Sequence, residues 1–405
     1  MKPNICFFFR ILACFLLFSS ADGHAETANG TDTLVTERLE QVDISLLTCE
    51  PHEEVYSLYG HTAIRINNRQ SGEDYVINYG VFDTTMNFFV IRFIFGLTDY
   101  TMMACPFKDF KDEYQHFGSG IYEQRLNMSP KEKIQFFIDL TQNAKPENII
   151  YRYNYFYNNC TTKARDILIN ALNGEVKYSP LTHLQQGEKS FRELIKTGNG
   201  EYRWTMAGND MLLGVGADAN TNHDERQFLP QVLSQDFDSA MVVYPDGSEK
   251  ALVDTAYWVL PTGKKWRNEE MNLFSYTPTQ CALAFLVLMI AFSLVEYYVA
   301  GDPLLWIHYA IYALYATAGT FLFLMLFSQH PTVRVNFQIL IFNPLFYIFA
   351  LPKYITRWGK YAMLTSLALF FVGNFLQCYA EGVNIMAAAM LVTFLPILFC
   401  RVKKM

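Results

Sequence analysis

The sequence lacks the basic stretches with which proteins bind nucleic acids. Its 405 residues include 32 lysines and arginines against 39 aspartates and glutamates, which gives a formal net charge of -7. Proteins that bind a phosphate backbone present clustered cations, usually interleaved with aromatic side chains. Because no such cluster occurs here, nucleic acid is excluded as a partner.

The sequence also lacks the residue spacings that are typical of metal and nucleotide sites. No two histidines lie one helical turn apart, as a zinc-binding helix would require. The glycines of residues 204–218 are not flanked by a strand and a helix, so they do not form a dinucleotide-binding fingerprint. We therefore expect neither a metal nor a cofactor.

Polar residues are scarce after Thr277. The apolar runs that follow are each about as long as a bilayer-spanning helix, and they occupy residues 279–300, 303–327, 335–352, 361–380 and 384–400. We expect an all-α bundle of five transmembrane helices, although Asn343 and Pro344 interrupt the third run. Five crossings after an exported domain leave the C-terminus in the cytoplasm, which agrees with the positive charges at 353–360 and 401–404.

Two ionisable residues, Glu296 and His308, fall within these apolar runs. Ionisable groups buried in a membrane are functional candidates by default. Both residues lie near the expected cytoplasmic ends of their helices, where interfacial placement is the simpler account. We assign neither of them to the chemistry.

The first 25 residues have the pattern of a secretory signal. Lys2 and Arg10 flank a short apolar run, and small residues precede cleavage positions at Ala21 and Ala25. We expect residues 26–276 to form an exported domain and residues 277–405 to anchor it in the membrane.

Three cysteines remain in the exported domain, namely Cys49, Cys105 and Cys160. An odd number leaves one of them free or paired with another molecule. A bridge between Cys49 and Cys105 would leave Cys160 free, but both could equally be reduced.

The stretch YRYNYFYNNCTTKARDILINALNG, residues 151–174, places Cys160 at the start of a helix. Apolar residues recur at helical spacing after it, Gly174 is a natural stop, and Asn158 or Asn159 would cap the first turn. The unpaired N–H groups and the dipole at a helix start favour an anion, so the thiol is shifted towards the nucleophilic thiolate. A buried structural cysteine is the alternative interpretation.

His61 is the preferred partner for this thiol, ahead of His52, His116 and His183. It begins a strand over residues 61–68, directly after a glycine, where its ring can project from the sheet edge towards the helix start. A thiol at a helix start and a histidine on a strand form the arrangement of papain-like enzymes, in which imidazole takes the thiol proton and a third polar group holds the ring.

A second strand over residues 75–82 would pair with the first as a hairpin. If the turn is centred near Arg69 or Gln70, His61 lies opposite Asn78 or Tyr79. Asn78 is therefore the candidate for the third polar group.

Three further segments carry expectations. The run MNFFVIRFIFG, residues 86–96, is either core or an apolar surface that meets a bilayer or an acyl chain. A second strand pair is expected over residues 100–128. Ser129, Pro130 and Glu132 predict a helix start with a capping box, and the buried face expected for that helix comprises Ile134, Phe137, Ile138 and Thr141.

The motifs YGHTAIRI, NYGVFD and YRYNYFYNNCTTKARD together resemble the Lnb-type N-terminal periplasmic domain, and the five-run tail is similar to the membrane domain of that family. The resemblance covers roughly residues 40–400. It implies that residues 26–276 form an α+β papain-like catalytic domain of the permuted NlpC type. This domain would lie in the periplasm, anchored in the bacterial inner (cytoplasmic) membrane by residues 277–405. It also implies lipoprotein N-acylation, in which an acyl chain passes from a membrane phospholipid through a cysteine thioester to the N-terminal amine of a diacylglyceryl-cysteine lipoprotein.

By the superfamily pattern, Cys160 would be the nucleophile, His61 the base and Asn78 the third member. Six further expectations concern substrate binding. An amide of Asn158 or Asn159 would meet the oxyanion, an apolar rim at Phe88 and Phe89 would exclude water, and Tyr151, Arg152 and Tyr153 would contact a lipid headgroup.

Two other functions compete with acyl transfer. A membrane-tethered papain-like peptidase acting on peptidoglycan would need an open, polar cleft. A non-enzymatic membrane scaffold would use Cys160 only structurally.

Overall fold

The computed structural model describes residues 35–52, 57–82, 87–179, 187, 189–199, 202–263, 275–300, 304–349 and 357–399. The chain divides into two compact units. The sheet unit is built from residues up to 93, 97–188 and 221–267, and the helical unit from 94–96, 189–220 and the chain from 268 onward. The expected signal segment and His183 lie outside the described residues.

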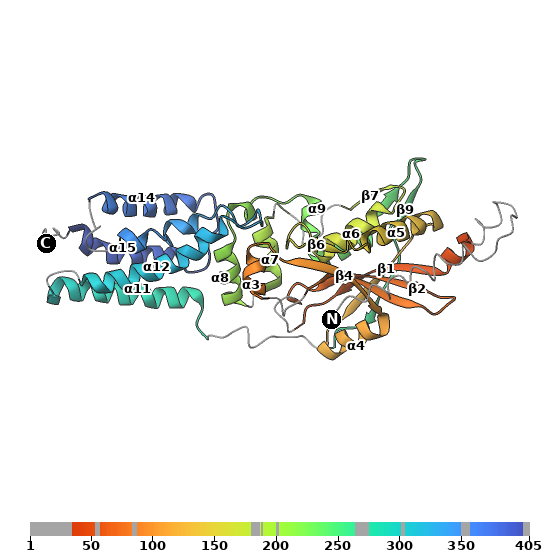
Figure 1. The fold of residues 1–405 in the computed structure, drawn as a ribbon, viewed down its shortest axis with the longest axis horizontal. Coiled ribbons are helices and arrows are strands. Elements are labelled where there is room, and N and C mark those ends of the chain that lie inside the picture. The colour runs from red at the N-terminus through yellow and green to blue at the C-terminus, as the bar shows by residue number, and fades with distance from the viewer. Residues whose placement is uncertain are drawn as a thin grey trace. The chain divides into compact units, whose positions relative to one another are not determined.

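The sheet unit is an α+β domain around a seven-stranded antiparallel sheet with the strand order β10-β5-β1-β2-β3-β4-β6 (Figure 1). Its strands are β1 (Val42–Cys49), β2 (His61–Asn68), β3 (Asp74–Val81), β4 (Asp99–Pro106), β5 (Ile121–Leu126), β6 (Ile150–Arg152) and β10 (Val253–Leu260). A second sheet comprises β7 (Glu175–Lys177), β8 (Met241–Val243) and β9 (Glu249–Ala251). The helices of this unit are α3 (Phe89–Ile94), α4 (Phe107–Phe117), α5 (Pro130–Asn143), α6 (Cys160–Asn170), α9 (His223–Arg226) and α10 (Pro230–Ser239).

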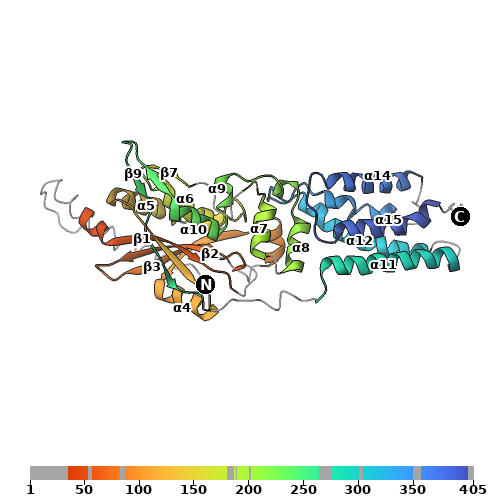
Figure 2. The same cartoon turned by 180° about the vertical axis from the view of Figure 1, so that it is seen from behind.

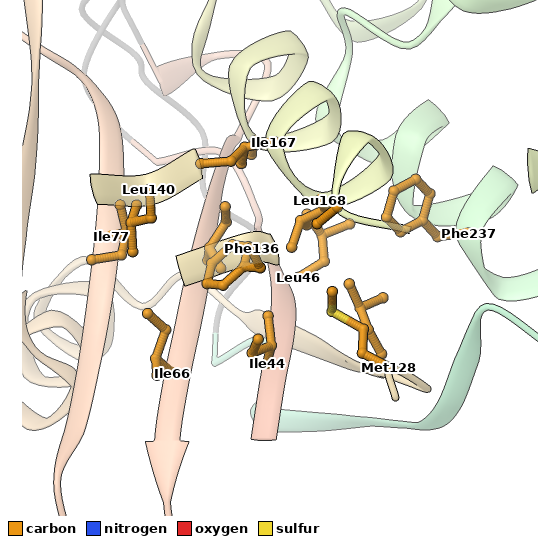
Figure 3. Close-up of a cluster of buried hydrophobic side chains, with 14 of the residues drawn as sticks. Ile44, Leu46, Ile66, Ile77, Met128, Phe136, Leu140, Ile167, Leu168 and Phe237 are labelled. Carbon is orange, nitrogen blue, oxygen red and sulfur yellow. The ribbon is translucent and has the colours of Figure 1, made fainter. Parts of the chain in front are cut away.

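Helices α5, α6 and α10 cover one face of the large sheet, and α4 covers the other (Figure 2). Side chains alternate between the two faces along each strand, so Ile64 of β2 packs below α6 while its neighbour Ala63 packs against α4. Figure 3 shows the larger core, in which Phe136 of α5 and Leu168 of α6 meet the strand residues. The start of α6 is thereby fixed against β2 and β3.

The expected hairpin and the capping box at Ser129 are confirmed, whereas two other expectations for this unit are wrong. The region 100–128 is not a strand pair, because the amphipathic helix α4 separates β4 from β5 and ends at Gly118, which has φ 69°. The buried face of α5 is formed by Phe136 and Leu140. Two of the residues expected there are exposed instead, Ile134 by 39% and Ile138 by 48%.

The helical unit contains α7 (Phe191–Asn199), α8 (Arg203–Leu212), the 3₁₀ helix η3 (Val215–Ala217), α11 (Pro278–Val295), the π-helical segment η5 (Glu296–Ala300), α12 (Leu305–Met325), the 3₁₀ helix η6 (Phe337–Leu340), α13 (Phe346–Phe349), α14 (Arg357–Gly373) and α15 (Val383–Phe399). Within the described residues, two helices, Pro278–Val299 and Leu305–Met325, are long and apolar enough to cross a membrane. Two shorter apolar helices cover Gly359–Gly373 and Val383–Pro396.

The third expected crossing, residues 335–352, is not one continuous helix over its described part. It comprises η6 and α13, separated by a turn at Asn343 and Pro344. The side chain of Asn343 accepts a hydrogen bond from the backbone N–H of Leu345 at 3.0 Å and so stabilises this turn.

Glu296 and His308, which are expected at the membrane interface, are both buried within the helical unit and contact each other. His308 Nε2 lies 2.9 Å from each carboxylate oxygen of Glu296. The same carboxylate accepts a hydrogen bond from the N–H of Leu304 at 2.6 Å, which satisfies a backbone donor at the start of α12. The pair therefore joins the end of α11 to the start of α12.

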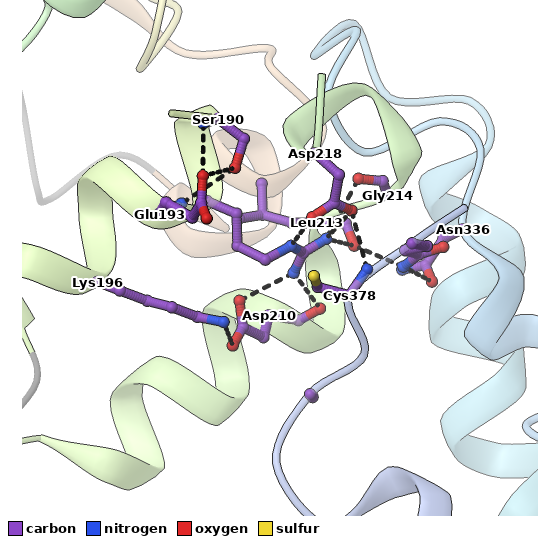
Figure 4. A network of polar contacts seen from close by, with 12 residues as sticks. Ser190, Glu193, Lys196, Asp210, Leu213, Gly214, Asp218, Asn336 and Cys378 are labelled. Carbon is purple, nitrogen blue, oxygen red and sulfur yellow. Dashed lines mark hydrogen bonds and ion pairs between the residues drawn. The ribbon is translucent and has the colours of Figure 1, made fainter. Parts of the chain in front are cut away.

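A buried arginine holds α7 and α8 together in the helical unit. Arg192 bonds Asp210 at 2.9 Å and Asp218 at 2.7 Å, and its side chain is 1% exposed. Residues from two other loops of the helical unit complete this network, part of which Figure 4 shows. Gln338 Nε2 donates to the carbonyl of Asp210 at 3.0 Å, and the N–H of Cys378 donates to Asp218 at 3.3 Å.

Candidate active site

Helix α6 begins at Cys160, as the sequence predicts. Its cap is Asn159, whose side-chain oxygen accepts a hydrogen bond from the N–H of Thr162 at 2.9 Å. The hydroxyl of Thr162 accepts the N–H of Asn159 in return, also at 2.9 Å. The helix ends at Asn170, before the expected stop at Gly174.

The helix start is joined to β2 next to His61. The hydroxyl of Thr62 donates a hydrogen bond to that of Thr161 at 3.1 Å, and the backbone N–H of Thr62 donates to the Cys160 sulfur. The hydroxyl of Thr161 lies 3.8 Å from the same sulfur. The sulfur thus lies at the N-terminus of a helix and receives further donors from the neighbouring strand.

His61 contacts both residues that the sequence analysis assigned to it. Its ring hydrogen-bonds the Cys160 thiol, and its Nε2 lies 3.0 Å from Asn78 Oδ1. The amide nitrogen of Asn78 points the other way, towards Cys105 Sγ at 3.6 Å. Asn78 therefore accepts the Nε2 proton, which leaves Nδ1 to exchange a proton with the sulfur.

The strand register differs by one to two residues from the expected one. Ala63 pairs with Asn78 and Ile64 with Ile77, so the paired residues end two positions after His61, whose side chain reaches Asn78. The shift follows from the turn, because Asn68 Oδ1 accepts the N–H groups of Gln70 and Ser71 and moves the turn centre beyond Gln70.

Gly80 makes room for the sulfur. A Cβ atom at this position would lie 3.3 Å from the Cβ of Cys160 and 3.9 Å from atoms of both Tyr100 and Tyr151. Its φ of 89° also lies in the region that L-residues avoid. Gly80 is thus where the Cys160 side chain approaches β3.

The electrostatics distinguish Cys160 from the other two cysteines of the sheet unit. Burial opposes ionisation of its thiol, but the charge and hydrogen bond of His61, with help from Thr62 and Thr161, lower the Cys160 pKa to about 7. Burial raises the pKa of Cys105 to about 11 and that of Cys49 further still. All three are free thiols, so Cys160 is the one held ready to ionise.

His52 and His116, the two alternative partners for the thiol within the described residues, contact aromatic side chains instead. His52 stacks on Phe117 with ring centroids 4.2 Å apart. Burial and the charge of His61 lower the His52 pKa to about 4. His116 lies on α4 beside the same phenylalanine. The pKa of His61 moves the opposite way: burial opposes its charge, but Cys160 and Asn78 raise its pKa.

The side-chain amides of both asparagines before Cys160 donate hydrogen bonds to backbone carbonyls. Asn159 Nδ2 donates to the carbonyls of Tyr155 at 3.0 Å and Phe228 at 2.9 Å, so no amide hydrogen of Asn159 is left for an oxyanion. Asn158 Nδ2 donates one hydrogen bond, to the carbonyl of Arg152 at 2.8 Å.

The three residues expected at a lipid headgroup lie near the end of β6, which pairs with β4. Arg152 is exposed and pairs with Asp99 at 2.8 Å. Tyr151 lies close to Gly80 and carries Lys163 over its ring at 4.9 Å. Tyr153 stacks on the ring of Tyr100, with centroids 4.1 Å apart.

The two phenylalanines of the expected apolar rim lie at the start of α3. Phe88 is 75% exposed, which overturns the core interpretation at this position, and its φ is 58°. Phe89 is partly buried and stacks on Phe82 with centroids 5.2 Å apart.

Three residues near the sulfur, Thr62, Thr161 and Gly80, were missed by sequence reasoning. Thr62 and Thr161 carry no local signal, because their roles depend on which segments meet in the fold. Gly80 does carry a local signal, because a glycine inside a strand pattern indicates that another group approaches the backbone closely. In the described part of the chain, no cluster of three His, Cys, Asp or Glu side chains could hold a metal ion.

Comparison with protein families gives two matches. Residues 32–190 match the Lnb N-terminal periplasmic domain, and residues 268–405 match the Lnb transmembrane domain. No curated protein and no solved structure matches the chain.

Proposed function

The chain belongs to the Lnb family and is a membrane protein with a periplasmic domain, and on that basis we propose that it is a lipoprotein N-acyltransferase with a cysteine nucleophile. The donor is a membrane phospholipid, and the acceptor is a diacylated lipoprotein. We further propose that the sheet unit is a permuted papain-like domain of the NlpC type, that the helical unit crosses the inner membrane five times, and that residues 1–25 are a signal peptide.

One observation carries this proposal: the hydrogen-bonded series Cys160–His61–Asn78 at the start of a helix. A thiol with a pKa of about 7 is substantially ionised at neutral pH, and thiolate is the form that attacks acyl groups. Asn78 holds the imidazole in the tautomer that can accept the thiol proton.

In the first half-reaction, the Cys160 thiolate attacks the carbonyl carbon of a phospholipid ester. The backbone N–H of Cys160 meets the oxyanion, and Asn158, which uses one of its two amide hydrogens on Arg152, supplies the second donor. The carbon–oxygen bond breaks, His61 gives its proton to the departing alkoxide, and an acyl thioester remains on Cys160.

In the second half-reaction, the N-terminal amine of the lipoprotein attacks the thioester. His61, now neutral, takes the proton from the amine as the amide forms and the Cys160 thiolate leaves. The thioester favours an amine over water only where water is kept away, which we assign to the apolar residues around Phe88 and Phe89. Arg152, with Tyr151 and Tyr153, is proposed to contact the lipid headgroup.

The test replaces Cys160 by alanine in cells and measures lipoprotein N-termini and muropeptides by mass spectrometry. We expect lipoproteins to lose the N-linked acyl chain while muropeptides stay unchanged. Altered muropeptides with intact N-acylation would instead indicate a peptidase. No change in either, with the variant present at wild-type level, would indicate a scaffold.

A further inference from the structure

Helix α3 exposes apolar side chains that no part of the described chain covers. Phe88, directly before the helix, is 75% exposed, Val90 is 66% exposed and Ile91 is 50% exposed. Single exposed apolar residues are common on proteins, but three within four positions form a continuous apolar face. The one charged residue of the helix is Arg92, which is exposed and donates to the carbonyl of Leu97 at 3.4 Å.

The end of α3 is bonded to the loop after α12. Ser328 Oγ donates to the carbonyl of Ile94, and the N–H of Gln329 donates to the carbonyl of Phe95, both at 2.9 Å. Ser328 lies three residues beyond Met325, where the apolar helix α12 ends. Val90 is four residues before Ile94 in the same helix, about 6 Å along the helix axis.

The buried side of α3 belongs to a closed circuit of aromatic contacts. Phe89 and Phe93 contact each other at 6.4 Å between centroids, Phe93 contacts Tyr153 at 5.9 Å, and Tyr153 stacks on Tyr100 at 4.1 Å. Phe82 closes the circuit, at 4.9 Å from Tyr100 and 5.2 Å from Phe89.

This circuit ends beside the nucleophile. Tyr100 and the Cβ of Cys160 both lie within 4 Å of the position that a Cβ of Gly80 would occupy. Aromatic side chains are therefore in contact with one another from α3 to Tyr100, next to the candidate active site.

We propose that α3 is an interfacial helix whose exposed face inserts into the acyl region of the outer leaflet, and that a phospholipid acyl chain enters along its aromatic side towards Cys160. An apolar face with a basic residue at its edge is the pattern of helices that lie in a membrane surface, and the Arg92 guanidinium suits the phosphate groups there. The entry of an acyl chain towards Cys160 rests on the proposed acyl transfer, whereas the insertion of α3 into the membrane does not.

The test compares two full-length variants, Val90→Trp and Ile138→Trp, in vesicles of phosphatidylcholine and phosphatidylglycerol with or without brominated acyl chains. Ile138 is a matched control, because it is an aliphatic residue that is 48% exposed on α5. The chain has five native tryptophans, so the emission that each variant adds to the wild type is measured. We expect bromine to reduce the added emission at least twofold for Val90→Trp and not for Ile138→Trp.

Equal quenching of the two introduced indoles would overturn the proposal. So would a blue-shifted, unquenched signal from Val90→Trp, because it would mean that another protein surface covers α3. Quenching does not depend on acyl transfer, so this result stands even where Cys160 is not acylated.

The entry route has a second readout, the rate of acyl transfer from vesicle phospholipid. We expect Val90→Asp to lower this rate at least tenfold and Ile138→Asp to leave it at the wild-type value. A wild-type rate for Val90→Asp would contradict the entry route.

Discussion

The sulfur of Cys160 differs from an ordinary buried thiol because several groups stabilise its negative charge. His61, the N–H of Thr62 and the hydroxyl of Thr161 together outweigh the effect of burial and lower its pKa to about 7. At Cys105 the effect of burial outweighs the hydrogen bond from Asn78 and raises the pKa to about 11. At the scale of single residues, this contrast is what gives the site its chemistry.

The first prediction concerns the pH dependence of Cys160 alkylation. Because the pKa is lowered, the reactive thiolate is present above pH 7 and is lost as the pH falls through 7. Iodoacetamide labelling of the full chain, followed at the Cys160 peptide by mass spectrometry, should therefore have its midpoint near pH 7. In His61→Gln the midpoint should move above the ordinary thiol range, because burial remains and the stabilising charge is gone. Equal midpoints in the two proteins would refute the pairing.

The second prediction uses two glycines with similar backbone angles. Gly80 has φ 89° and Gly72 has φ 76°, so alanine at either position is strained by about 1–2 kcal/mol. Only the methyl group at position 80 would contact Cys160, since no atom lies within 4 Å of one at position 72. Gly80→Ala should slow acyl transfer, by less than the roughly 10²-fold that misplacing a reacting group by about 1 Å costs, because a contact of 3.3 Å displaces Cys160 only slightly. Gly72→Ala should keep the wild-type rate, and equal rates in the two variants would show that Gly80 does not position the sulfur.

The third prediction concerns Asn78. Its oxygen holds the Nε2 proton of His61, so Asn78→Ala should free the ring to adopt the other tautomer and to turn. Acyl transfer should slow, but by less than the roughly 10²–10⁴-fold expected when His61 itself is replaced by alanine. Single-turnover rates of the two variants test this order. A wild-type rate for Asn78→Ala would show that Asn78 does not contribute to the reaction.

At the scale of elements, local signals in the sequence were sufficient where a single segment determines its own structure. The start of α6, the capping box of α5 and the β2–β3 hairpin follow from caps and turn residues that lie next to one another in the chain. The register of the hairpin was displaced because the side chain of Asn68 adds hydrogen bonds to the turn.

Other elements depend on distant contacts and were not predictable in the same way. The apolar residues Ile134 and Ile138 gave α5 the wrong buried face, because Phe136 and Leu140 pack against the sheet instead. The run containing Phe88 was ambiguous, since burial there depends on what the apolar segment meets. Glu296 and His308 bury each other, a pairing across two helices that no local pattern indicates.

The fourth prediction concerns Arg192, which holds α7 to α8. Removing one partner from a buried ion pair leaves an uncompensated charge and typically costs about 3–5 kcal/mol. Arg192→Leu should therefore strongly lower the thermal midpoint of the full chain in detergent. Arg203→Leu is the matched control. Arg203 forms an ion pair with Glu381, but the Arg203 side chain is 58% exposed. Exposed ion pairs contribute about 1 kcal/mol or less to the free energy of unfolding. Equal midpoints for both variants would show that the Arg192 network does not stabilise the unit.

At the scale of the whole molecule, the division into an α+β part and an apolar helical part could be predicted from composition. The grouping of residues 189–220 with the helical unit could not, because it depends on polar contacts such as Gln338 to the carbonyl of Asp210. The family matches cover both parts of the chain. Together they describe a membrane protein with a periplasmic domain.

The central claim is that Cys160 carries an acyl chain between donor and acceptor. The purified full-length protein is incubated with phospholipid vesicles without any lipoprotein, and its intact mass is measured. We predict a mass increase of one acyl chain, located on the Cys160 peptide, released by neutral hydroxylamine and absent from Cys160→Ala. An unmodified wild-type protein that still transfers acyl chains when lipoprotein is added, or an adduct that persists in Cys160→Ala, would contradict the account.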